Sequence, residues 1–252
     1  MKIVVCVKQV AVLGDDIEFT ADHRDIDRDY LDFALNEWDT FATEEALRLR
    51  EALGGEVVVV TVGDADVEDA LHRCLAMGAD RVVRIWNDGL GSLDPIRVAR
   101  ALAVVVSDEQ PDLVLCGAQS SDAVEGATGV ALAALLDLPS VAVVTKVEPA
   151  ADASSVVVDR ELEGGLVEVL DVTLPALLTI QTGINEPRYV TLRAMQQAKQ
   201  SPLPVVEPGD LGDGAYRVRR MYTPERVRAQ MLAGRAPDIA ARIAELVREA
   251  AR

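Results

Sequence analysis

The sequence has little aromatic content and little positive charge. Aromatic residues make up 4% of its 252 positions while 50% are hydrophobic, so its core must be built from aliphatic side chains. Lys and Arg number 25 against 42 Asp and Glu, which gives a formal net charge of −17. Because proteins that bind nucleic acid neutralise phosphates with Lys and Arg, this balance argues against nucleic acid as a partner.

Cysteines and long apolar runs are also scarce. The three cysteines, Cys6, Cys74 and Cys116, lie far apart in the sequence, and this odd number favours a reducing compartment over a disulfide framework or a CxxC zinc site. No apolar stretch approaches the about 20 residues that a membrane-spanning helix needs. Residues 3–7 have a strand-like pattern without a cleavage region, so no secretory signal is expected. We therefore expect a protein that is not embedded in a membrane and is cytoplasmic, or in the mitochondrial matrix if eukaryotic.

Runs rich in Val and Ile alternate with segments of helical spacing in the first half of the chain. The predicted strands are residues 2–7, 56–62, 81–86 and 112–117. Nearly continuous aliphatic runs are typical of strands buried on both faces, as in parallel sheets covered by helices. Helices are predicted between these strands; one of them begins at Asp94-Pro95, where an aspartate cap precedes a first-turn proline. The alternation predicts an α/β fold with a mainly parallel, doubly wound, Rossmann-like sheet.

The pattern changes after Pro139. We expect strands and a hairpin added beside the main sheet, with Gly164-Gly165 as a turn. The extended segments are residues 141–147, 155–159, 166–172 and 176–181. A Pro- and Gly-rich run beyond residue 201 predicts an extended arm. The chain then ends in an amphipathic helix, which must pack on the body or on a partner chain because isolated helices of this length are marginal.

Residues for catalysis are few. His23 and His72 are the only histidines, and neither sits beside a Ser or Cys and an acid in a recognisable nucleophile arrangement. His72 and Cys74 flank one position of a predicted helix and point to different faces, so they do not make a metal pair. Glu44 and Glu45 fall in the first turns of a helix, where acidic residues are favoured, and we expect them to be solvated. No catalytic residue and no metal site are expected.

The turn after the fourth predicted strand is rich in small and hydroxylated residues. In open α/β sheets, ligands bind outside the carboxyl ends of the strands, and a helix start offers free amides to an anion. Gly117, Gly126 and Gly129 would let the backbone approach a phosphate. Ser120, Ser121 and Thr128 can donate hydrogen bonds from their hydroxyls. The turn matches neither the GxxxxGK[ST] nor the GxGxxG pattern. A phosphate site and a long structural turn therefore both remain open.

Residues 185–192, Asn-Glu-Pro-Arg-Tyr-Val-Thr-Leu, form a second unusual segment. It follows a predicted strand and places a proline, a charge pair and a tyrosine in one short loop. Tyr and Leu offer apolar contact and Arg offers a planar fork, and such residues anchor many protein interfaces. The residues alone favour a structural turn and leave an interface role open.

Several stretches together resemble the beta subunit of electron transfer flavoproteins, the small subunit of a heterodimer that carries electrons from dehydrogenases. Asn36-Glu-Trp-Asp39 is similar to the family's Asn-Pro-Phe-Asp, and Asn185-Glu-Pro-Arg-Tyr189 is similar to its most specific signature. The resembling stretches cover nearly the whole chain and are residues 2–10, 36–47, 76–81, 185–189 and 208–212.

The resemblance implies that FAD lies mainly in the alpha subunit and that this chain binds AMP. Some family members hold a second FAD in place of AMP and split electron pairs between two acceptors. Because Ala118 stands where the family often has Lys or Arg, phosphate binding is expected to rest on amides and hydroxyls. The implied cofactor-binding residues are Cys6, Asn36, Glu37, Trp38, Asp39, Val62, Gly117, Ala118, Gln119, Ser120, Ser121, Asp122, Ala123, Val124, Glu125, Gly126, Ala127 and Thr128.

The resemblance also implies partners. It places six residues in the family's recognition loop, namely Asn185, Glu186, Pro187, Arg188, Tyr189 and Leu192. This loop docks flavin-dependent dehydrogenases such as acyl-CoA dehydrogenases, with Leu192 in the anchoring position. The arm and final helix would wrap the alpha subunit, and a quinone oxidoreductase would accept the electrons downstream.

We therefore expect an electron-carrier subunit, not an enzyme, built from two parts. Residues 1–200 would form an α/β nucleotide-binding domain that includes the recognition loop and following helix at 183–200. Residues 201–252 would form the C-terminal arm and helix. The alternative from another class is a stand-alone adenine-nucleotide-binding enzyme, such as an ATP pyrophosphatase-type ligase, against which stands the absence of an SGGxDS-type run.

Overall fold

The fold is described from a computed structural model of the chain. The described residues are 1–12, 14, 17–88, 90, 93–224, 229 and 231–250. Their centre is a nine-stranded sheet. Its strand order is β11 (Val205–Val206), β5 (Arg81–Ile85), β4 (Glu56–Val62), β1 (Lys2–Cys6), β6 (Leu113–Gly117), β10 (Ala176–Ile180), β7 (Ser140–Pro149), β8 (Ser155–Leu162) and β9 (Leu166–Thr173). The strands from β11 to β7 are parallel, and β8 and β9 are antiparallel, which confirms the predicted mainly parallel sheet.

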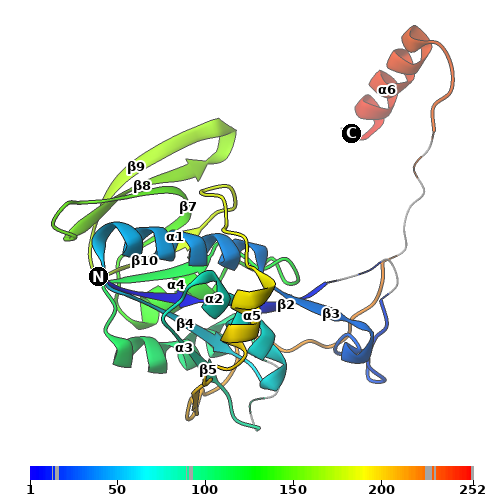
Figure 1. The fold of residues 1–252 in the computed structure, drawn as a ribbon. Coiled ribbons are helices and arrows are strands. Elements are labelled where there is room, and N and C mark those ends of the chain that lie inside the picture. Colours follow the sequence, from blue (N-terminus) through cyan, green and yellow to red (C-terminus); the bar gives the residue numbers. More distant parts are fainter. Residues whose placement is uncertain are drawn as a thin grey trace.

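Two strands were predicted in the wrong place. β7 and β10 do not belong to an addition beside the sheet, because they pair in parallel with each other and β10 also pairs in parallel with β6. All five residues of β10 are buried, as expected for a strand with helices over both faces. Only β8 and β9 form the added hairpin, which is visible at the upper left of Figure 1. Gly164 and Gly165, both at φ 77°, make the turn between them as predicted.

Helices cover both faces of the sheet, which confirms the doubly wound architecture (Figure 1). Ile3 and Val5 of β1 share one buried cluster with residues of α1 (Glu37–Leu53) and α2 (Glu68–Met77). Val4 and Cys6 point to the other face and pack with α3 (Pro95–Glu109) and α4 (Thr128–Leu135). This alternation follows from the two-residue period of a strand. The short helix α5 (Leu192–Ala198) packs beside α2.

A small ribbon beside the main sheet is absent from the sequence-based expectation. β2 (Gln9–Val12) and β3 (Asp32–Leu35) pair antiparallel as a separate two-stranded sheet. The described residues also form three short 3-10 helices, namely η1 (Arg28–Tyr30), η2 (Ala65–Val67) and η3 (Glu163–Gly165). The ribbon matters for the site because β2 continues directly from the carboxyl end of β1.

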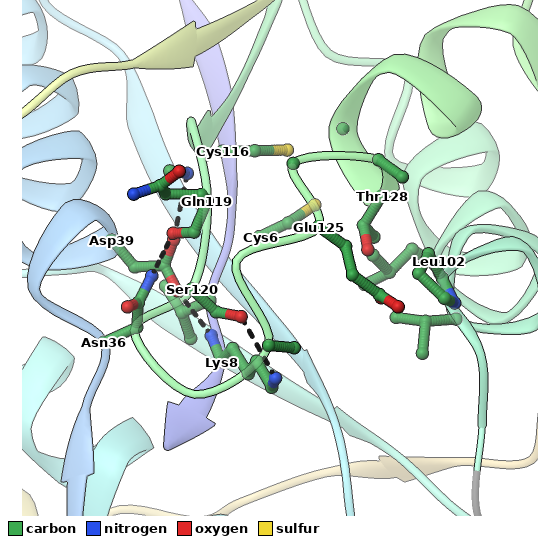
Figure 2. A pocket seen from close by; sticks show the side chains of 18 of the residues that line it. Cys6, Lys8, Asn36, Asp39, Leu102, Cys116, Gln119, Ser120, Glu125 and Thr128 are labelled. Atoms are coloured by element: carbon green, nitrogen blue, oxygen red, sulfur yellow. Dashed lines mark hydrogen bonds between the residues drawn. The ribbon is translucent and has the colours of Figure 1, made fainter. Parts of the chain in front are cut away.

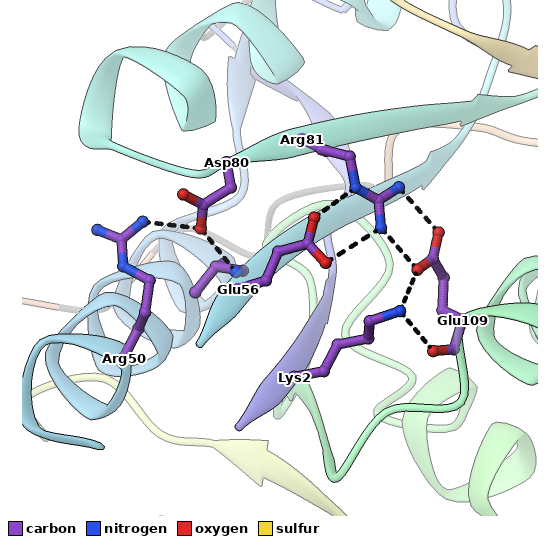
Figure 3. Close-up of polar contacts among 7 residues, drawn as sticks. Lys2, Arg50, Glu56, Asp80, Arg81 and Glu109 are labelled. Atoms are coloured by element: carbon purple, nitrogen blue, oxygen red, sulfur yellow. Dashed lines mark hydrogen bonds and ion pairs between the residues drawn. The ribbon is translucent and has the colours of Figure 1, made fainter. Parts of the chain in front are cut away.

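Ion pairs occupy the amino ends of the parallel strands (Figure 3). Arg81 Nε donates to Glu56 Oε1 at 2.6 Å, and Arg81 Nη2 donates to Glu109 Oε2 at 2.7 Å. Lys2 Nζ lies 3.0 Å from the same Glu109 oxygen. The side chains of these pairs are partly exposed to solvent, which weakens each ion pair, so we assign this end of the sheet only a structural role.

The C-terminal arm begins against the body and ends in a helix apart from it. β11 pairs with β5, and Leu211 is buried in the cluster under α3. Within α6 (Ala236–Ala250) no residue is buried, and Ile243 and Val247 are 49% and 62% exposed. Figure 1 shows α6 standing away from the sheet. None of the helices in the described part of the chain is both long and apolar enough to cross a membrane.

Candidate functional site

A cavity of about 240 Å³ opens at the carboxyl ends of β1 and β6 (Figure 2). The chain leaves β1 towards β4 on one side, whereas β6 pairs with β1 on the other side. This reversal of strand order is the place where open α/β sheets bind ligands.

The structure brings most of the sequence-predicted nucleotide residues to this cavity. Those that line it are Cys6, Asn36, Asp39, Val62, Gly117, Ala118, Gln119, Ser120, Ala123, Glu125, Gly126, Ala127 and Thr128. Glu37, Trp38, Ser121, Asp122 and Val124 lie nearby in sequence but are not among the lining residues. The lining also includes Gly129 of the predicted turn and residues that the sequence analysis did not assign to the site, namely Val7, Lys8, Leu93, Pro95, Val98, Leu102, Cys116 and Tyr216.

Hydrogen bonds connect the start of α1 to the turn that follows β6. Asn36 Nδ2 donates to Gln119 O at 2.9 Å, and Asn36 Oδ1 accepts from Ser121 N at 3.2 Å. The Asp39 carboxylate accepts from Lys8 N at 2.7 Å and from Gly117 N at 2.9 Å. Asn36 and Asp39 are both buried, so they hold the ends of β1 and β6 in a fixed relation at the cavity.

The Asp39 carboxyl gives a pH-dependent prediction. Burial raises its pKa from 3.8 to about 7, against the opposing effect of the two N–H groups. Because the folded pKa exceeds the unfolded one, this group stabilises the fold most below about pH 4, and that stability is lost as the pH rises to about 7.

We therefore expect Asp39→Asn to change the pH dependence of folding. The free energy of unfolding of the parent minus that of the variant should fall between pH 4 and 7, because only the parent can lose this proton. Urea unfolding at several pH values measures the difference. The matched control Asp152→Asn removes an exposed carboxyl whose pKa is lowered by Ser154, so it should not show this fall. A parent–variant difference that stays constant for Asp39→Asn would contradict the raised pKa.

The turn after β6 has the features of an anion site. Val124 and Gly126 have φ of 56° and 59°, so the backbone curls round the cavity. A Cβ at Gly126 would lie 3.2 Å from Ala118 O, which leaves little room for a side chain there. α4 starts at Thr128, and its N-cap residue, Ala127, has no side-chain oxygen to bind the first N–H groups. These amides are therefore available to an anion.

Lys8 supplies a cation that the sequence analysis missed. Its Nζ lies 3.2 Å from Ser120 Oγ (Figure 2). The same Nζ lies 2.6 Å from Asp122 Oδ1, on the same turn. A charged ammonium group therefore lies against this turn, where Ala118 itself carries no charge. The position of Lys8 just beyond the first predicted strand, at the same sheet edge, was the signal that could have revealed it.

The remaining walls of the cavity are apolar. Val98 and Leu102 of α3 line one side. Cys6 and Cys116 are partners in the β1–β6 register and are buried free thiols. The hydrogen bond with Cys6, together with burial, raises the pKa of Cys116 well above its usual range, so that this thiol is uncharged. The site thus combines a polar turn suited to phosphate with an apolar space suited to a planar base.

No metal centre emerges from the described part of the chain. There, no three His, Cys, Asp or Glu side chains come together in an arrangement that could hold an ion. Cys74 is buried, and burial raises its pKa to about 12, which removes it further from ligand chemistry.

The loop at 185–192 is fastened to α1, and this corrects the expectation for Glu44 and Glu45. Both glutamates are buried, at 4% and 6% exposure, because the loop covers them. Arg188 Nε and Nη2 donate to the two Glu44 oxygens at 2.8 and 3.0 Å, and Arg188 N donates to Glu44 Oε2 at 3.0 Å. Asn185 Nδ2 donates to Glu45 Oε2 at 2.9 Å. Burial raises the pKa of Glu45, against the effect of that hydrogen bond.

The same loop exposes its large apolar side chains. Tyr189 is 89% exposed and Leu192 is 75% exposed. Thr191 caps α5 by accepting from Ala194 N at 3.2 Å, so Leu192 stands at the start of a short helix. Of the other predicted partner residues, Glu186 is exposed and Pro187 is half-buried. The loop thus presents Tyr189 and Leu192 to solvent from a segment that is hydrogen-bonded to α1.

Comparison with known proteins gives concordant matches. Residues 25–211 match the family model described as the electron transfer flavoprotein domain. The chain is 43% identical to the electron transfer flavoprotein subunit beta of Methylophilus methylotrophus, with 99% of this chain and 98% of that protein covered. It is 34% identical to the subunit beta of Bacillus subtilis, with 90% of each covered, and 36% identical to that of Homo sapiens, with 84% and 83% covered.

Proposed function

The chain belongs to the electron transfer flavoprotein family as a beta subunit, and from this premise we propose that it carries electrons as half of a heterodimer with an alpha subunit. In this proposal it is an electron-carrier subunit and not an enzyme. FAD held mainly by the alpha subunit supplies the redox chemistry when bound. Electrons come from flavin-dependent dehydrogenases, such as acyl-CoA dehydrogenases, and go to a quinone oxidoreductase. The complex works in the cytoplasm, or in the mitochondrial matrix if the source is eukaryotic.

The cavity at the ends of β1 and β6 carries the second part of the proposal, a structural AMP. Its volume of about 240 Å³ is below the roughly 300–1,000 Å³ of common small-molecule pockets, which favours a mononucleotide over a second FAD. The backbone turn with Lys8 would bind the phosphate, and the apolar walls would enclose the adenine. The residues of this chain thus bind and orient a nucleotide, and no proton or electron transfer is assigned to them.

Two surfaces support the proposed partners. The exposed Tyr189 and Leu192, on a loop fastened to α1, suit the docking of a dehydrogenase. The unpaired apolar face of α6 suits burial against the alpha subunit, as does its place at the end of an arm. The division into a nucleotide-binding domain at 1–200 and an arm at 201–252 belongs to this same proposal.

The nucleotide content of the heterodimer tests the proposal. The chain is co-expressed with its alpha subunit, and the purified complex is denatured and its nucleotides separated by chromatography. We expect one FAD and one AMP per heterodimer. Two FAD would favour the bifurcating alternative, in which a second FAD replaces AMP. ATP turnover by the isolated chain would instead favour the stand-alone enzyme.

A further inference from the structure

A residue of the C-terminal arm reaches the nucleotide cavity. Tyr216 lines the cavity together with the turn after β6, although the two are far apart in sequence. Its hydroxyl donates a hydrogen bond to Glu125 Oε1, and Glu125 also lines the cavity. The arm is thereby joined to the turn that we assign to the phosphate.

The position of Tyr216 is set by the body of the protein. Arg100 Nη1, on α3, donates to Leu211 O at 2.7 Å and to Asp213 O at 2.9 Å. Asp94 caps α3 through Oδ1, which accepts from Ile96 N at 2.9 Å, while its Oδ2 accepts from Ala215 N at 3.0 Å. Asp94 is buried, so its two oxygens tie the arm firmly to the start of α3.

These contacts make the arm a bridge across the cavity. Ala215 is held at the start of α3, where Pro95 and Val98 line one wall, and Tyr216 is held at Glu125 on the turn that lines another. Tyr216 is 54% exposed as a residue, so it is not packed into the core and can contact a ligand in the cavity that it lines. A ligand between α3 and the turn would lie beneath this bridge.

We propose that Tyr216 is a nucleotide-binding residue that closes the site over the bound nucleotide and slows its release. The proposal rests on the AMP site proposed above and adds to it a contact from the arm. Tyr216 acts in two ways. Its ring covers the nucleotide, and its hydroxyl keeps the ring in place by donating to the Glu125 carboxylate, a charge-assisted bond stronger than a neutral one.

The chemistry of the pair agrees with this role. The hydrogen bond with Glu125, with burial as a second cause, raises the pKa of Tyr216 to about 12, so the hydroxyl remains a donor at neutral pH. The donated hydrogen bond also offsets part of the Glu125 negative charge, which would otherwise repel a phosphate on the same turn.

The test measures AMP release from the complete heterodimer. Complexes of parent, Tyr216→Phe and Tyr216→Ala with the alpha subunit are loaded with radiolabelled AMP and chased with an excess of unlabelled AMP. Loss of one hydrogen bond should speed release about fivefold in the Phe variant, and loss of the ring as well should speed it about tenfold or more in the Ala variant. The FAD content should stay that of the parent in both.

Tyr222→Ala is the matched control. Tyr222 lies on the same arm, is 68% exposed and is not among the described residues that line the cavity, so AMP release should keep the parent rate. Equal release from parent, Tyr216→Phe and Tyr216→Ala would overturn the proposal while leaving the AMP site intact. A parent complex without AMP would overturn the AMP site and the role of Tyr216 together.

Discussion

Replacing Arg188 by methionine is expected to lower the free energy of unfolding by about 3 kcal/mol and to slow electron transfer from a dehydrogenase. The loss of stability is expected because the negative charge of Glu44 would remain buried without its partner. The Glu44 side chain is 6% exposed, and Arg188 supplies three of its hydrogen bonds, two from the guanidinium group and one from the backbone. Without the guanidinium, a buried carboxylate loses its cation. The expected loss is at the low end for buried pairs because the Arg188 side chain is 31% exposed.

A double-mutant cycle separates the charge from the packing. Glu44→Gln together with Arg188→Met should be less destabilising than Arg188→Met alone, because no unpaired carboxylate remains. Chemical denaturation gives the free energies of unfolding of the parent, the two single variants and the double variant. Additive losses would contradict a coupled, buried pair.

Leu192→Ala is the matched variant for function. It removes an exposed side chain of the same loop and leaves the Arg188–Glu44 contact in place. We expect the rate of electron transfer from the dehydrogenase to fall about tenfold, as for the loss of an interface anchor, with stability and nucleotide content unchanged. A parent rate in both Leu192→Ala and Arg188→Met would remove the loop from the docking surface.

The strands of the sheet could be predicted where burial on both faces requires a continuous run of aliphatic residues. The strands β1, β4, β5 and β6 are within a residue or so of the predicted segments, because each is covered by helices on both faces. β10 has the same kind of run, Ala-Leu-Leu-Thr-Ile. However, it lies between β6 and β7 because the chain comes back into the main sheet after forming β8 and β9. Periodicity identifies a strand but does not identify its neighbours.

The site shows the same limit at the level of side chains. The turn from Gly117 to Thr128 could be found because its small residues, strand exit and helix start are contiguous in sequence. Tyr216 could not, since its hydrogen bond with Glu125 spans 91 positions. Glu44 and Glu45 were expected to be solvated because acidic residues favour the first turns of a helix, but residues 185–188 cover them. Local pattern predicts the elements, whereas these contacts come from tertiary packing.

Replacing Gly117 by alanine is expected to weaken nucleotide binding about tenfold or more and to destabilise the fold by about 1–3 kcal/mol. A Cβ at this position would lie 2.3 Å from Asp39 Oδ1 and 2.6 Å from Trp38 Cβ, so the first turn of α1 must move. That movement breaks the hydrogen bond from Gly117 N to Asp39 and disturbs the one from Lys8 N. The carboxyl ends of β1 and β6 then both lose their hydrogen bonds to Asp39, which shape the cavity.

The AMP content of the purified heterodimer and its thermal unfolding measure the two effects. Gly14→Ala is the control, because a Cβ at Gly14 would meet nothing within 4 Å, and this variant should keep full AMP and stability.

The steric contacts at Gly117 and Gly126 also predict which substitution destabilises the fold more. Gly126→Ala, whose Cβ would approach Ala118 O at 3.2 Å, should release AMP with less loss of stability than Gly117→Ala, because it crowds the turn and leaves α1 in place. Full AMP in Gly117→Ala would show that the first turn of α1 does not shape the nucleotide site.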